Sequence, residues 1–271
     1  MRKATNQNRV VSDTKKLLEP LRAFKVPVIG FVIGARCQSD LTREQKRSVL
    51  KMWLDAGGEL GNHTWSHLDI NDVSLKDYEA EILRTDAEMH RLLDPISIHY
   101  FRAPFLRDGT NIETKKQMQN FLREHGYQEA PVTLDNNDWV FAAAFSHALK
   151  TNNRAQAHAI EDAYIPYMLS TVEFFEKRSM QILGRECPQV LLIHASRLNA
   201  EMMPALLAMF QARGYSFVTI EKAMSDSAYK NVDPYTGLKG ISWIHRWGLL
   251  KGMPIELEPA EPSWITKLAM R

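Results

Sequence analysis

The sequence has 271 residues, of which 45% are hydrophobic and 24% are charged, so it is long enough to bury a sizeable core in one α/β domain. Its 34 basic and 32 acidic residues leave a formal net charge of +2, which provides no electrostatic footprint for nucleic acid and none for a membrane surface. This small net charge fits a protein that binds a small molecule or a polymer substrate better than one that binds nucleic acid or a membrane surface.

The cysteines and the first residues of the sequence argue against a disulfide-rich protein, a zinc knuckle and a membrane-spanning protein. Cys37 and Cys187 lie far apart and form no Cys-x-x-Cys motif, so we expect neither a disulfide framework nor a zinc knuckle. The first eight residues are polar, and no apolar run approaches the length of a membrane span. The sequence as written is therefore expected to carry no signal peptide and no transmembrane helix.

Strands and helices are expected to alternate along the chain. Ser12 can cap a first helix, and Thr42 with Gln45 forms a capping box for the next, which Gly57 stops. The expected helices cover residues 12–24, 42–56, 74–95, a segment that ends at Gly126, 154–178 and 199–214. The expected strands cover residues 28–33, 59–62, 98–101, 131–134, 190–194 and 216–218.

This alternation predicts a parallel α/β architecture, either a barrel or a doubly wound sheet. Candidate reactive side chains follow four different strands, and barrel active sites are built at these C-terminal strand ends. A doubly wound sheet usually carries a Gly-rich turn at one switch point, and no G-x-G-x-x-G is present. The sequence therefore favours a barrel.

Two histidines four residues apart, His63 and His67, follow the strand at 59–62. On a helical turn, residues with this spacing share a face, so both rings could reach one divalent metal ion. Thr64 stands where the metalloprotease motif His-Glu-x-x-His needs a glutamate, so that motif is excluded. Nine histidines can produce such a pair by chance, so the neighbouring motifs must decide whether the pair is a metal site.

Four short segments together resemble motifs of the polysaccharide deacetylases, carbohydrate esterase family 4. The similarity runs from about residue 12 to about residue 224, and the segments are Gly61-Asn62-His63-Thr64-Trp65-Ser66-His67, Arg102-Ala103-Pro104-Phe105, Asp135-Asn136-Asn137-Asp138-Trp139 and Leu192-Ile193-His194. The resemblance implies an irregular (β/α) barrel of seven strands and a divalent metal, usually zinc. It implies removal of acetyl groups from N-acetylated glycans by a protein that is usually exported.

The resemblance also implies a role for each matching residue. His63 and His67 would bind the metal, which polarises the acetyl carbonyl and lowers the pKa of its water. His194 would be the general acid for the departing amine, as its unperturbed pKa near neutrality permits. Arg102 would pair with a carboxylate, and Asp138 would orient the arginine or the acid. Phe105 would line the site and turn its backbone N–H toward the oxyanion, while Leu192 and Trp139 would wall the acetyl pocket.

One family motif has no counterpart. Family members begin with a strand that ends in an Asp-Asp pair, which supplies the catalytic base and the third metal ligand. Residues 5–11 are neither an apolar strand nor acidic, and Asp13 lies at an expected helix start. We therefore expect a barrel without its first strand, either as an N-terminally truncated form or as a natural relative that lacks the base.

Alternative interpretations accompany these assignments. The chain could be a non-catalytic relative that keeps a sugar- or metal-binding pocket, or a different metal-dependent hydrolase that uses His99. Asp135 could be a turn residue beside two asparagines, and His194 a hydrogen-bonded rim residue. We expect residues 1–224 to form the barrel domain and residues 225–271 an extension packed on it, where Trp243 and Trp247 share a helix face. The sequence leaves the oligomeric state open.

Overall fold

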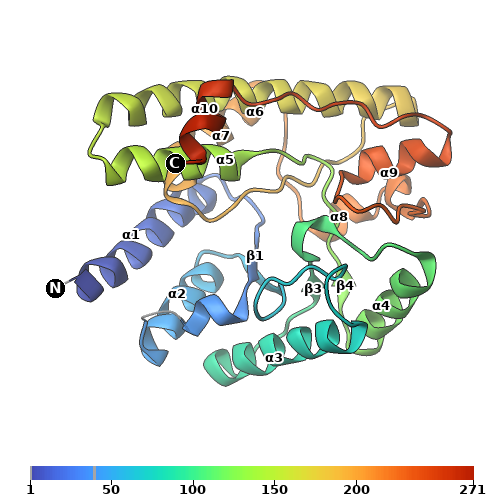
Figure 1. Cartoon of the computed structure of the whole chain (residues 1–271), viewed down its shortest axis with the longest axis horizontal. Helices are drawn as coiled ribbons and strands as arrows, with labels where there is room; N and C mark the ends of the chain where they lie inside the picture. The colour runs from blue at the N-terminus through green and yellow to red at the C-terminus, as the bar shows by residue number, and fades with distance from the viewer. Residues whose placement is uncertain (1, 39–40) are drawn as a thin grey trace.

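The computed structural model describes residues 2–38 and 41–271, and it places a parallel sheet among helices (Figure 1). Four strands pair in chain order, each parallel to the next, namely β1 (Ile29–Val32), β2 (Glu59–Asn62), β3 (Tyr100–Phe101) and β4 (Gln128–Glu129). The α/β class and the parallel sheet are confirmed. Parallel strands place their C-terminal ends at one edge, so the loops after β2 and β3 start side by side.

The helices precede, connect and follow these strands. They are α1 (Arg2–Ala23), α2 (Arg43–Asp55), α3 (Leu75–Leu93), α4 (Ile112–Glu124), α5 (Asp138–Lys150), α6 (Arg154–Leu183), α7 (Arg197–Ala212), α8 (Ile220–Met224), α9 (Trp243–Leu250) and α10 (Ser263–Ala269). Three short 3-10 helices lie between them, η1 (Gly34–Gln38), η2 (Pro104–Leu106) and η3 (Ser227–Lys230). Among the described residues, no helix is both long and apolar enough to cross a membrane.

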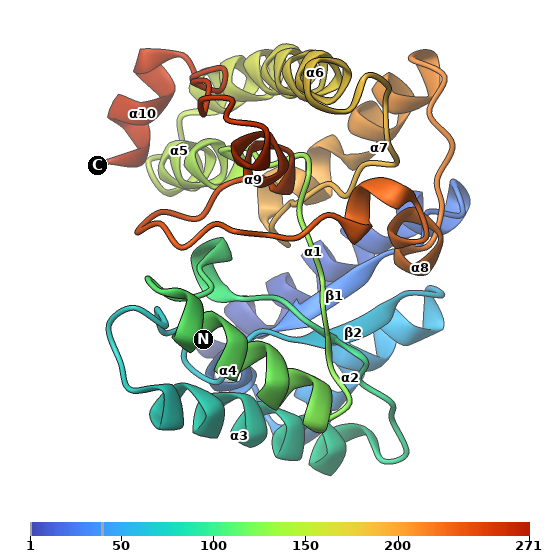
Figure 2. The ribbon, with the colours of Figure 1, turned by 90° about the vertical axis from the view of Figure 1, so that its right-hand side faces the viewer.

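Two hydrophobic clusters divide the molecule. One lies between the sheet and helices α3 and α4, where Tyr78, Ile82 and Met89 are fully buried. The other is larger and joins α1, α5, α6, α7, α9 and α10. Figures 1 and 2 both show the sheet with α2, α3 and α4 in the lower half and α5, α6, α9 and α10 in the upper half. The expected site residues come from segments of both halves.

Local signals account for the elements that lead to the site. Thr42 and Gln45 form the expected capping box of α2, and Gly57 at φ +84° follows the end of that helix. In β2, a Cβ on Gly61 would lie 2.5 Å from the ring of Phe31, so only glycine fits there. The absent side chain lets β1 and β2 pair closely just before His63.

Several sequence predictions were wrong. The first helix begins at Arg2 rather than at Ser12, so residues 5–11 are helical in backbone. Residues 216–218 form no strand, and residues 131–134 and 190–194 meet through a single parallel bridge between Leu134 and Leu191. The sheet therefore does not close into a barrel within the described residues. Part of the hydrogen bonding of residues 131–134 goes instead to the C-terminal segment, where Trp243 N–H donates to the Val132 carbonyl at 2.8 Å.

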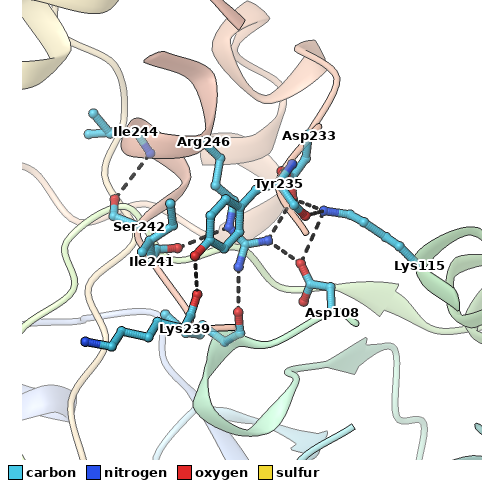
Figure 3. A network of polar contacts seen from close by, with 10 residues as sticks. Asp108, Lys115, Asp233, Tyr235, Lys239, Ile241, Ser242, Ile244 and Arg246 are labelled. Atoms are coloured by element: carbon cyan, nitrogen blue, oxygen red, sulfur yellow. Dashed lines mark hydrogen bonds and ion pairs between the residues drawn. The ribbon is translucent and has the colours of Figure 1, made fainter. Parts of the chain in front are cut away.

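The C-terminal residues are part of the packed structure. Trp243 and Trp247 are buried in the larger cluster, and α10 packs against α5. Arg246 of α9 lies in a buried charged network with Asp108, Lys115 and Asp233 (Figure 3). This network ties α9 to α4 and to the loop before it. The division at residue 224 remains a prediction, because these contacts do not define a domain boundary.

Candidate functional site

The loop after β2 brings His63 and His67 together, although it is not a helical turn. Thr64 and His67 have φ values of 62° and 61°, and this left-handed backbone folds the loop tightly. The two rings lie 4.9 Å apart between centroids in an edge-to-face arrangement. The expected proximity is therefore present, but it results from two unusual backbone conformations rather than from helix periodicity.

The buried Asn62 side chain holds this loop in place. Its Nδ2 donates to the Ile82 carbonyl at 2.9 Å and to the Tyr127 hydroxyl at 3.0 Å. Its Oδ1 accepts from the Thr64 N–H at 3.0 Å, and the Thr64 hydroxyl accepts from the His67 N–H at 3.1 Å. All polar atoms of Asn62 are thus engaged, so the histidine positions are fixed before any ligand arrives.

Each histidine has a defined electrostatic state. His63 Nδ1 lies 2.6 Å from the Arg102 carbonyl oxygen, which can only accept, so Nδ1 carries the proton and Nε2 keeps its lone pair. Burial lowers the pKa of His63 to about 3, so its ring is neutral at physiological pH. Burial and then Arg36 lower the pKa of His67. Neutral imidazoles are the form that binds metal ions.

Asp138 and His194 form a hydrogen-bonded dyad, in which the Asp138 carboxylate is buried and the His194 ring is partly exposed. One carboxylate oxygen of Asp138 lies 2.7 Å from His194 Nδ1, and the other accepts from the His194 N–H at 2.8 Å and from Asn199 Nδ2 at 2.7 Å. Burial opposes the charged form of His194, but the bond to Asp138 outweighs it and the pKa of His194 is raised. Its side chain is 51% exposed, so the outer face of the ring can reach a substrate.

Arg102 follows β3 and is buried beneath the site. Its guanidinium lies 4.3 Å from the Phe31 ring centroid and donates to the carbonyls of Ala130 and Pro131 at 3.4 and 3.3 Å. Burial lowers the pKa of Arg102 to about 10, and the charge of Asp135 opposes this shift. Arg102 forms no ion pair in the part of the chain that the structure describes. Backbone carbonyls, rather than the expected carboxylate partner, hold its head group.

The three expected substrate-binding residues occupy different positions. Phe105, at φ 57° in η2, places its ring 4.6 Å from that of His67. Trp139 follows Asp138 in the first turn of α5, and its side chain is 55% exposed. Leu192 is half-buried, and its carbonyl accepts from Asn136 Nδ2 at 2.6 Å. Contacts thus join Phe105 to the histidine pair, while Trp139 and Leu192 flank the Asp138–His194 dyad.

The histidine pair, His63 and His67, lies within electrostatic reach of the Asp138–His194 dyad. His194 lowers the pKa of both His63 and His67, so the dyad faces the histidine pair. His99 lies elsewhere, because its charge acts on Glu59 at the start of β2, at the other end of the sheet. The hypothesis of a third histidine ligand from His99 therefore receives no support from the geometry.

The donor set fits a divalent metal in part. His63 has a free Nε2 and a carbonyl-bound Nδ1, which is the usual arrangement of a metal-binding histidine. Catalytic zinc normally takes three protein ligands. No group of three or more His, Cys, Asp or Glu side chains suited to a metal occurs among residues 2–38 and 41–271. The histidine pair could thus offer two protein ligands, and water or substrate would have to complete the coordination.

Sequence reasoning gave too little weight to Asp135 and overlooked Asn199 and Glu258. Burial, followed by the charge of Glu258, raises the pKa of Asp135 to about 7. Its place after the segment 131–134, at the same edge as the other polar residues, was the available signal. No comparable signal marked Glu258, because it reaches the site from the C-terminal segment.

Comparison with known proteins identifies related sequences. Residues 7–130 match the family model described as polysaccharide deacetylase. The chain is 26% identical over 92 residues to a chitooligosaccharide deacetylase of Sinorhizobium fredii, which covers 34% of this chain and 40% of that protein. It is 24% identical over 126 residues to a peptidoglycan-N-acetylglucosamine deacetylase of Bacillus cereus, covering 46% and 41%. The chain thus matches about two fifths of the length of each of these curated relatives.

Solved structures confirm the fold. A CE4 family pseudoenzyme from Bacillus anthracis superposes with a TM-score of 0.52 at 16% identity over 79% of this chain and 60% of that one. The peptidoglycan deacetylase PdaC from Bacillus subtilis gives 0.51 at 23% identity over 79% and 84%. The family model ends before Asp135, so it does not cover the second half of the site.

Proposed function

We propose that this chain, whose residues 7–130 match the polysaccharide deacetylase family model, hydrolyses acetyl groups from the amide nitrogen of an N-acetylated glycan. The observation that carries the proposal is a neutral histidine pair facing a histidine whose proton is held by a buried aspartate. Such a division of proton affinities within one site is typical of acid–base hydrolysis. Chito-oligosaccharides and peptidoglycan fragments are the substrates that the names of the two relatives suggest.

Each residue has a part in the proposed reaction. His194 is the general acid: Asp138 keeps its Nδ1 protonated and orients the ring, which leaves Nε2–H to protonate the departing amine. Phe105 and Trp139 offer exposed aromatic faces on which a sugar ring can stack. The charge of Arg102 persists at neutral pH and favours negative charge developing nearby.

A divalent ion, zinc by the chemistry of its imidazole ligands, belongs to this proposal. His63 would hold it through Nε2, which its contact with Arg102 leaves free, and His67 through a ring nitrogen. Such an ion, when bound, supplies a polarised acyl carbonyl and a more acidic water. Asn62 and Thr64, whose hydrogen bonds fix the loop, would then position His63 and His67 for the ion.

The experiment measures acetate release from N-acetylated chito-oligosaccharides and from peptidoglycan fragments. We expect His194→Ala to lower turnover by about 10² to 10⁴-fold with unchanged zinc content, because it removes proton donation alone. The His63→Ala, His67→Ala double variant should lose both zinc and activity, while His99→Ala should keep both. An unchanged rate in His194→Ala would remove His194 from the mechanism.

A non-catalytic sugar-binding protein is the second candidate. The observation that favours it is the set of only two histidine ligands among the described residues. Isothermal titration with N-acetylated oligosaccharides distinguishes the two candidates. Binding by a zinc-loaded, folded protein that releases no acetate would favour the second, and acetate release would exclude it.

A further inference from the structure

The carboxylate of Asp135 lies where the charges of the site converge. Its charge raises the pKa of Arg102, which follows β3, and that of His194, which follows residues 190–193. His63 contacts Arg102 directly through its Nδ1 and the arginine carbonyl. Asp135 is thus the carboxylate that lies in electrostatic reach of both the buried arginine and the general acid, whereas Asp138 is fully engaged by His194 and Asn199.

The loop that carries Asp135 is held firmly. Asn136 Nδ2 donates to the Leu192 carbonyl at 2.6 Å, and its Oδ1 accepts from the Asp138 N–H at 2.9 Å. Asp135 Oδ1 accepts from the Asn136 N–H at 2.9 Å. No donor from the described residues reaches its other oxygen, so that oxygen is available to an outside proton donor such as water.

The C-terminal segment between α9 and α10 covers this loop. Glu261 accepts from Asn137 Nδ2 at 3.1 Å and from the Thr266 hydroxyl at 3.0 Å. Glu258 lies 3.3 Å from Nε2 of the buried His245. Glu258 is thereby placed close enough to Asp135 for its charge to act there. The segment that covers the loop thus also brings a negative charge within electrostatic reach of Asp135.

We propose that Asp135, on the loop that also holds Asp138 against His194, accepts the proton of the attacking water beneath the C-terminal segment that carries Glu258. The inference rests on the proposed function and deepens it. The water oxygen bonds to the acetyl carbon while one of its protons passes to Asp135. The carbon–nitrogen bond then breaks as His194 gives its proton to the amine, which yields acetate and a free amino group.

The electrostatic surroundings suit a base that works near neutrality. Burial and Glu258 raise the pKa of Asp135 to about 7, and Asp138 adds to this, while the Asn136 N–H and His194 act against it. Arg102 is the further charge that faces it, from the loop after β3. General bases are most effective when their pKa lies near the working pH.

The test compares pH profiles of kcat/KM for acetate release. Asp135→Asn should lower the rate by about 10² to 10⁴-fold, and Asp135→Glu should recover part of it. Glu258→Gln should move the acid limb to lower pH, because a neighbouring negative charge is lost. Glu256→Gln is the matched control: it loosens the same segment by removing a partner of Arg178, but should leave the acid limb unmoved.

A second measurement does not depend on activity. The folded state binds a proton at Asp135 that the unfolded state releases, so the stability of the wild type relative to Asp135→Asn should fall as the pH rises from 3.8 to about 7. Urea unfolding at several pH values measures this.

The outcomes separate the two proposals. If the wild type releases acetate and Asp135→Asn retains its rate, or if Glu256→Gln shifts the acid limb as much as Glu258→Gln, the inference fails and the proposed function stands. If the folded, metal-loaded wild type releases no acetate, the proposed function fails, and the role of Asp135 fails with it.

Discussion

His63 and His194 are the same residue type with opposite proton affinities. Burial without a carboxylate partner lowers the pKa of His63 to about 3, whereas Asp138 raises that of His194. Two features differ: His63 is more deeply buried, and a backbone carbonyl faces its Nδ1 where a carboxylate faces Nδ1 of His194. At this scale the surroundings, rather than the residue type, determine whether the neutral or the charged form of the ring is favoured.

Replacement of Asp138 by Asn should lower the pKa of His194, because the charge that stabilises the imidazolium is lost. The folded-state pKa of His194 lies above 6.5, so its pairing with Asp138 stabilises the protein fully below pH 6.5 and loses this effect as the pH rises through the folded value. Asp138→Asn should therefore destabilise more at pH 5.5 than at pH 9. NMR titration of His194 and urea unfolding measure both effects, with the exposed Asp72→Asn as control. A pKa unchanged by Asp138→Asn would contradict this account.

Elements with strong local signals were predicted correctly, and those that depend on distant partners were not. The capping box of α2, the Ser74 cap of α3 and strands β1 and β2 are all present. Strand β4 consists of Gln128 and Glu129, whose strand character comes only from pairing with β3. Helix α5 begins at Asp138 inside a motif that resembled a strand end, and its apolar run lacks a clear amphipathic pattern.

The capping box provides a test at the scale of one element. Thr42→Ala should lower the free energy of unfolding by about 1 kcal/mol, because the Gln45 N–H loses its side-chain acceptor. Ser48→Ala on the exposed face of α2 is the control, with an expected effect within about 0.5 kcal/mol. Urea unfolding midpoints at pH 7 give the comparison, and equal effects of the two substitutions would show that the cap contributes nothing.

Across the whole molecule, buried charge joins the two hydrophobic clusters. Arg246 donates to the Leu106 carbonyl at 2.6 Å and to Asp233 at 2.7 Å, and Lys115 lies 2.5 Å from Asp233 (Figure 3). The motifs predicted individual site residues, but they could not predict that α9 and the segment after it would complete the surroundings of Asp135. Those contacts link residues more than a hundred positions apart, and no local pattern encodes them.

Arg246→Met should destabilise the protein by about 3–5 kcal/mol, because it leaves Asp108 and Asp233 buried with one cation fewer. The control is Arg185→Met, which breaks the more exposed pair with Asp226 and should cost at most about 1 kcal/mol. Thermal and urea unfolding of both variants provide the measurement. A loss below about 1 kcal/mol in Arg246→Met would mean that apolar contacts alone hold α9 in place.

The contact between Asn137 and Glu261 spans 124 positions, which has a consequence for synthesis. On the ribosome, the sheet with α3 and α4 leaves the exit tunnel first and can bury its own apolar cluster while translation continues. The loop at 135–138 gains its covering segment only when translation has passed Glu261. A nascent chain would therefore hold the loop of His63 and His67 in place well before the loop of Asp135 is covered, so the activity that we propose would arise as one of the last events of biosynthesis.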